Sequence, residues 1–138
     1  MLVSRKQELR AEGGQALVEF ALVVPLLILI LMGIFDLGWA VYAKNTITDA
    51  AREGARTGIV LSATDAQITS RVRAAAPSLS NLQVTIVPAT TRTYGQPITV
   101  TVVYTYVPIT PLIGQIVTGN GLRLQGTSSM NVEGVIQY

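Results

Sequence analysis

Two acidic side chains stand at the ends of the most apolar stretch of the chain. Sixteen uncharged residues, Phe20 to Phe35, separate Glu19 from Asp36. A carboxylate one turn inside an apolar helix is costly to bury alone, and ionisable groups within membrane segments usually mark function. Glu19 is therefore a candidate for a charge contact with a positive partner. The alternative is a solvated acid at the lipid headgroups, which the dipole of a helix N-terminus favours.

The composition gives little support to catalytic chemistry. The chain has no histidine and no cysteine, which excludes Ser-His and Cys-His nucleophile pairs, disulfides and the usual zinc sites. Beyond the apolar region the acids Asp65 and Glu133 are single and far apart in sequence. The net charge of +2 comes without a basic run. We expect no enzyme activity, cofactor, metal site or nucleic-acid partner.

One long helix is predicted to carry both acids of the apolar region. A helical pattern extends from Gly14 to Gly58. At about 1.5 Å per residue this helix spans roughly 65 Å, about twice the ~30 Å hydrocarbon core of a bilayer. Half of it must therefore stand outside the membrane. Pro25 lacks the N–H for one backbone hydrogen bond, which predicts a kink at this point.

The far end of the apolar run has the composition of a membrane–water interface. Trp39 and Tyr42 follow Asp36 closely, and aromatic residues at such a depth are typical of an interfacial belt. We interpret Asp36 as an interfacial acid, or alternatively as a partner for Lys44, two turns further along a similar face.

Small residues line one face of the helix beyond this interface. Ala50, Gly54 and Gly58 recur every four positions, a spacing that lets another helix approach closely. Two packing partners are open: the helices of other subunits, and the chain's own sheet.

A short second helix is expected after the long one. It would extend from Asp65 to about Ala76, with Ser62 or Thr64 as its N-terminal cap and Pro77 as its terminator.

The remainder predicts a three-stranded antiparallel sheet. Apolar and polar residues alternate over 82–86, 98–106 and 122–133, the period of half-buried strands. The weakly apolar middle of the third run, Gly126 to Ser129, indicates an edge strand or a bulge. Meander order is the simplest topology. With a helix covering its apolar face, this sheet completes an α+β fold.

A short motif at the head of the long helix resembles a known processing site. Gly14 is followed by four residues, then by Glu19 and the aromatic Phe20, as in type IV prepilins. The Glu-Phe form is similar to that of the tight adherence (Tad) pilus. The resemblance continues to Arg56 along the N-terminal signature of TadE-like pseudopilins.

This resemblance implies a pilin-like fold, a domain order and an assembly role. A prepilin peptidase would cut between Gly14 and Gln15, which divides the chain into a leader (1–14), a membrane anchor and filament-core helix (15–58) and an extracytoplasmic head (59–138). Glu19, with Phe20 beside it, would pair with the terminal amine of a neighbouring subunit. The implied partners are copies of the chain or other pilins, the pilus assembly platform and the lipid membrane.

The expected location is the cytoplasmic (inner) membrane, crossed once, and then an extracellular filament used for adhesion. Arg5, Lys6 and Arg10 precede the apolar run and favour a cytoplasmic N-terminus. Three alternatives stay open: cleavage of a signal peptide after Ala43, an uncleaved signal anchor, and a monomeric membrane-anchored binding module. Within the pilin class, the chain is either a priming subunit at the filament base or the main polymerising subunit.

Overall fold

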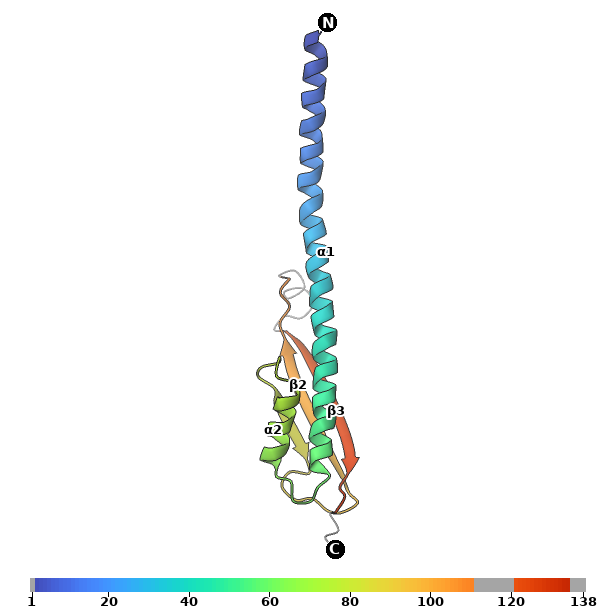
Figure 1. Cartoon of the computed structure of the whole chain (residues 1–138), viewed down its shortest axis with the longest axis vertical. Helices are drawn as coiled ribbons and strands as arrows, with labels where there is room; N and C mark the ends of the chain where they lie inside the picture. Colours follow the sequence, from blue (N-terminus) through green and yellow to red (C-terminus); the bar gives the residue numbers. More distant parts are fainter. Residues whose placement is uncertain (1, 111–120, 135–138) are drawn as a thin grey trace.

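The computed structural model describes residues 2–110 and 121–134, with side chains from residue 14 onward in these ranges. One long helix projects far beyond a small head, in which a second helix and three strands pack on its C-terminal part (Figure 1). The elements, in chain order, are α1 (Leu2–Gly58), α2 (Asp65–Ala75), β1 (Gln83–Val87), β2 (Pro97–Tyr106) and β3 (Leu122–Asn131).

Helix α1 is longer than the sequence pattern predicted. It begins at Leu2 and not at Gly14, so the polar residues of the expected leader continue the same helix. Pro25 lies inside α1 without interrupting it, and the kink at this residue stays a prediction. The helix ends at Gly58, as the sequence suggested.

The N-terminal cap of helix α2 determines where this helix begins. The Gln67 backbone N–H donates to Thr64 Oγ1 (3.2 Å), and the Thr64 backbone N–H donates to Gln67 Oε1 (2.9 Å). This reciprocal capping box satisfies two otherwise unpaired donors. Thr64, rather than Ser62, is therefore the cap of α2. The buried side chains of Ile68 and Val72 belong to the core of the head.

The three strands form an antiparallel meander in the order β1-β2-β3, which confirms the predicted α+β fold. The pairing of β2 with β3 is unbroken from Pro97 opposite Asn131 to Tyr106 opposite Leu122. Of the two alternatives for the third strand, the structure therefore has the edge strand and not the bulge.

Helices α1 and α2 cover one face of this sheet. The centre of β2 is the most deeply buried part, with Ile98, Val100 and Val102 at 0% exposure. The opposite face is mostly polar, and on it Thr99 Oγ1 donates a hydrogen bond to Ser129 Oγ (3.1 Å). The apolar core has the following buried members: Ala43, Ile47, Ala50, Ala51, Ala55, Ile68, Val72, Ala76, Leu79, Leu82, Ile98, Val100, Val102 and Val132.

Candidate functional site

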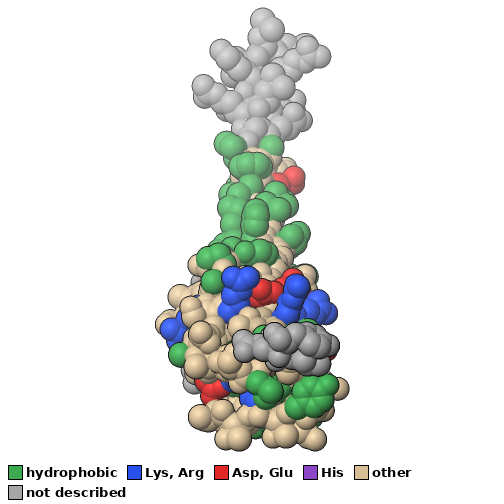
Figure 2. Space-filling view, turned by 60° about the horizontal axis from the view of Figure 1, so that its bottom comes forward, with side chains coloured by type: hydrophobic (Ala, Val, Ile, Leu, Met, Phe, Trp, Pro, Cys, Tyr) green, Lys and Arg blue, Asp and Glu red, His purple; other side chains and the backbone are tan. Residues whose placement is uncertain are grey.

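The N-terminal part of α1 is an apolar surface without cover from the rest of the described chain. Figure 2 shows apolar side chains around this rod where it leaves the head. Its large apolar side chains, from Leu17 to Phe35, are mostly 41–74% exposed. The helix is long and apolar enough to cross a membrane, and none of its most apolar window is buried inside the protein. An apolar surface of this size requires lipid or protein around it. We call residues 14–35 the arm.

Glu19 lies at the exposed start of the arm. Gln15, one turn earlier, donates a hydrogen bond from Nε2 to Glu19 Oε1 (3.3 Å). Among the side chains that the structure describes, no cation forms an ion pair with Glu19. Phe20 beside it is 67% exposed. The predicted assembly residues thus share one exposed turn, and the carboxylate is accessible to a partner outside the chain.

Asp36, at the other end of the apolar run, has a role that the sequence did not reveal. Its carboxylate accepts hydrogen bonds from the Tyr106 hydroxyl (2.5 Å to Oδ1) and from two backbone N–H groups, those of Ile109 (2.9 Å to Oδ1) and Thr110 (2.9 Å to Oδ2). Only 4% of the residue is exposed. Asp36 therefore fastens the chain beyond β2 to α1, and we call these hydrogen bonds the latch.

The latch overturns both sequence interpretations of Asp36. A solvated interfacial acid would be exposed, and Asp36 is buried. The suggested partner Lys44 instead donates from Nζ to the backbone carbonyl of Gln125 on β3. The donors of the latch lie 70 to 74 residues away along the chain. No local sequence pattern indicates a contact of that range.

The latch predicts an unusual titration of Tyr106. Burial, together with the hydrogen bond to Asp36 and its negative charge, raises the pKa of Tyr106 from 10.0 to about 12. Because the folded state favours the protonated phenol, stability from this group is complete below pH 10.0 and is lost as the pH rises toward 12. In an absorbance titration of tyrosine, a late transition is expected, and Tyr106→Phe should remove it. A Tyr106→Phe curve that coincides with wild type would contradict the buried hydrogen bond.

The small-residue face of α1 meets the chain's own head. Ala50 has 0% exposure. A Cβ atom added to Gly54 would lie 2.5 Å from Val72 Cγ2 of α2, and one added to Gly58 would lie 2.5 Å from Ile98 Cδ1 of β2. Of the two partners considered for Ala50, Gly54 and Gly58, the structure places the chain's own α2 and sheet against them.

Comparison with known proteins identifies the segment that contains the arm. The family model described as TadE-like protein matches residues 14–56. This segment is TadE-like. Neither the search of curated proteins nor that of solved structures gave a match. The TadE-like match agrees with the resemblance seen in the sequence and indicates a structural protein associated with the Tad pilus. Together with the exposed apolar helix, it suggests that the chain is anchored in a membrane.

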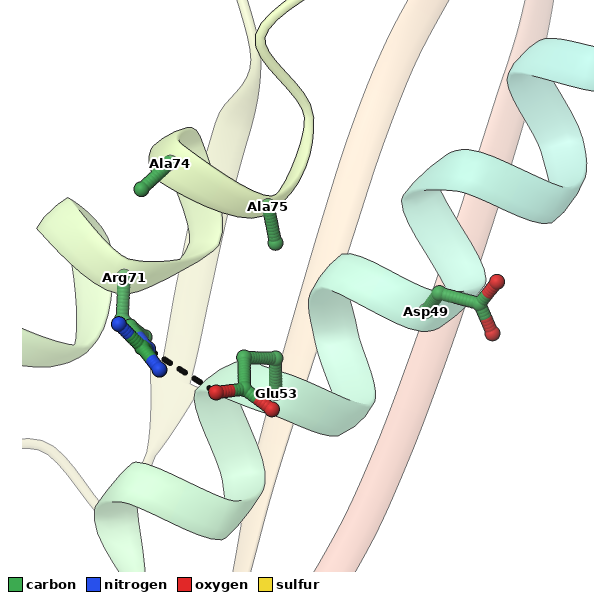
Figure 3. Close-up of a pocket in the computed structure, with 5 residues that line it drawn as sticks. All are labelled: Asp49, Glu53, Arg71, Ala74 and Ala75. Carbon is green, nitrogen blue, oxygen red and sulfur yellow. Dashed lines mark hydrogen bonds and ion pairs between the residues drawn. The ribbon is translucent and has the colours of Figure 1, made fainter.

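The TadE-like segment also contributes to a shallow groove on the head. Asp49 and Glu53 of α1 line it with Arg71, Ala74 and Ala75 of α2 (Figure 3). Arg71 Nε pairs with Glu53 Oε1 at 2.9 Å, while Asp49 pairs with Arg52 at 3.1 Å. These side chains are 33–70% exposed, and ion pairs at a protein surface stabilise a fold by about 0–1 kcal/mol. Since its charges are already paired, we assign no ligand to this groove.

The loop between β1 and β2 is held by another acid of the head. Asp65 accepts a hydrogen bond from the Thr90 backbone N–H (3.1 Å) and pairs with Arg92. The side chain of Arg92 is only 2% exposed. This ion pair fastens the loop to the start of α2. Among the described residues, no group of three or more Asp, Glu, His or Cys side chains is placed to hold a metal ion.

Proposed function

We propose that this chain is a structural subunit of a Tad-type pilus. Its arm first holds the monomer in the cytoplasmic membrane and later packs against the arms of other pilins, in the filament or at its base. One observation supports this proposal above the others: a TadE-like arm whose apolar side chains are exposed, with a single accessible acid near its start. The assembled filament would act in adhesion and surface attachment.

The physical basis of assembly is an exchange of apolar surroundings. In the bilayer the arm contacts lipid, and in a filament the arms of neighbouring subunits can replace that lipid. Glu19 is the exception, because its carboxylate is costly to bury without a positive partner. The terminal amine of a neighbouring subunit, freed by cleavage before Gln15, would supply that charge. Glu19 then acts as the residue that sets the register between subunits.

The proposed division of the chain follows from the same role. Residues 1–14 form a leader that a prepilin peptidase removes, residues 15–58 form the membrane anchor and filament core, and residues 59–138 form the extracytoplasmic head. The small-residue face packs inside the head, so the contacts between subunits fall to the arm. The basic residues before the apolar run favour a cytoplasmic N-terminus.

Processing can be tested by the intact mass of protein isolated from its native membrane. We expect the chain to lack the mass of residues 1–14, and Gly14→Leu to retain it. A side chain at Gly14 meets open space, with no atom within 4 Å of an added Cβ, so a block would act on the peptidase and not on folding. Gly38 also has open space around it, and Gly38→Leu is the matched control that should still be processed. Native protein of full mass, or a chain that begins after Ala43, would contradict the proposal.

A further inference from the structure

The head has exposed apolar side chains at the end nearest the arm. After β2, Val107 is 67% exposed and Ile109 is 75% exposed. In Figure 1 this part of the chain, drawn in orange, continues from β2 alongside α1 toward the N-terminal part of the helix. We call Val107 and Ile109 the tip. Two such side chains together are unfavourable in water, at about 25 cal/mol per Å² of apolar surface.

The latch fixes the position of the tip along the axis of α1. The backbone N–H of Ile109 donates to Asp36, and Asp36 directly follows the apolar run. Phe35 and Leu37, its neighbours in α1, are 74% and 67% exposed. Because a helix rises only about 1.5 Å per residue, the tip and these two side chains lie at one level. The exposed apolar surface of the arm therefore continues onto the head.

The buried carboxylate at this level is satisfied within the chain. The Asp36 carboxylate is occupied by the Tyr106 hydroxyl and by the backbone N–H groups of Ile109 and Thr110. Unpaired polar groups would oppose entry into an apolar medium at a cost of several kcal/mol each. Since these donors and the acceptor satisfy one another, the latch itself adds no such cost when the tip leaves water.

Aromatic and basic side chains follow on the side toward the head. The rings of Trp39 and Tyr42 pack with their centroids 5.4 Å apart, and both residues are partly exposed. Arg123, exposed on β3, pairs in register with Thr105, just before the tip. The order of apolar, aromatic and basic groups corresponds to the acyl region, the interface and the anionic headgroups of a bilayer.

From this arrangement we propose that the tip inserts into the headgroup–acyl boundary beside the arm. The chain then contacts the bilayer at two places, the arm and the tip, and the latch on Asp36 holds them at the same depth. This inference rests on the proposed membrane anchor. A second contact restricts the tilt of α1 and its attached head relative to the bilayer, because a single spanning helix alone is free to tilt.

The depth of single labels in vesicles tests this proposal. The chain has no cysteine, so Ile109→Cys, Leu27→Cys and Tyr94→Cys each give one site for a nitroxide label. The labelled full chains are reconstituted in vesicles of phosphatidylethanolamine and phosphatidylglycerol. Accessibility to oxygen, which concentrates in lipid, is compared with accessibility to a water-soluble nickel chelate. Tyr94 is the matched control, since it is 69% exposed and lies near Leu61, beyond the far end of α1.

Compared with the label at Tyr94, the labels at Leu27 and Ile109 should be less accessible to the nickel chelate and more accessible to oxygen. If Leu27 is in lipid and Ile109 is in water, the second contact is wrong and the anchor stands. A label at Ile109 shielded from both reagents indicates a protein neighbour and also overturns the proposal. If Leu27 itself is in water, the anchor fails, and with it this inference.

Removing the latch tests separately whether the latch holds the tip at its depth in the bilayer. In Asp36→Ala, the label at Ile109 should regain accessibility to nickel while the label at Leu27 keeps its depth. Circular dichroism of the same sample monitors whether the head stays folded. A folded Asp36→Ala head whose label at Ile109 stays in lipid would show that the tip needs no latch.

Discussion

Glu19→Ala should abolish filaments that contain this chain, while the protein stays in the membrane at its normal level. Glu19 lies on the exposed start of the arm, where its described contact is a 3.3 Å hydrogen bond from Gln15. The substitution therefore removes nothing from the core of the head. It removes the single negative charge between the leader and Asp36, which the proposed assembly pairs with a terminal amine. Electron microscopy of sheared fibres and immunoblotting of the membrane fraction measure the two effects.

Two variants separate charge from side-chain size in this experiment. Glu19→Gln keeps the length of the side chain and its hydrogen bonding but not its charge, and should fail to assemble like Glu19→Ala. Asp49→Ala removes an acid that is also exposed on α1, where it pairs with Arg52, and this variant should assemble normally. Filaments in normal number from Glu19→Ala, at equal protein levels, would show that the electrostatic role is wrong.

Gly126→Ala should strongly destabilise the head. Strand β3 crosses α1 so closely at this residue that an added Cβ would lie 2.7 Å from the backbone oxygen of Ile47 and 2.8 Å from the backbone N of Thr48. Backbone atoms in a helix cannot move aside as a flexible side chain can. Overpacking of this kind costs about 1–3 kcal/mol and occasionally more. We expect the upper end of that range, because β3 would have to separate from α1.

Thermal unfolding of the full chain in detergent, followed by circular dichroism, measures this loss. Ser128→Ala is the matched control: it lies two residues along the same strand, opposite Val100, and its side chain is half-buried. This variant should change stability by no more than about 0.5 kcal/mol. An unfolding temperature for Gly126→Ala equal to that of wild type would contradict the close approach of β3 to α1.

Local patterns predicted the elements of this fold well. The alternation of apolar residues located all three strands, and meander order followed because strands adjacent in sequence usually pair. The end of α1 at Gly58 and the cap at Thr64 also follow from the chemistry of single residues. The start of α1 was placed too late, at Gly14, because the mixed charges of residues 2–13 give no apolar periodicity.

Contacts distant in sequence could not be predicted in the same way. Asp36 meets Tyr106, Ile109 and Thr110 only because β2 runs back along α1, and this direction is a property of the complete fold. Gly126 was noted as a weakly apolar position, although its importance lies in the approach of two backbones. The face of Ala50, Gly54 and Gly58 fitted two partners equally well. Only the three-dimensional structure shows that this face fits against Val72 and Ile98 of the chain's own head.

The contacts of the arm have a consequence for assembly. The head uses the C-terminal part of α1 for its own core, so extraction from the membrane need not disturb the head. In the proposed assembly, the arm changes from lipid neighbours to protein neighbours while the latch keeps the chain after β2 fixed to α1. In this account the head is carried as a preformed unit, and the arm and the tip are the parts that exchange lipid for other neighbours.

The most direct test is immunogold electron microscopy of native fibres with antibodies against the head. The account predicts labelled filaments, along their length for a main subunit or at one end for a priming subunit. Only unlabelled fibres, with the chain recovered solely as separate particles at every concentration, would contradict it.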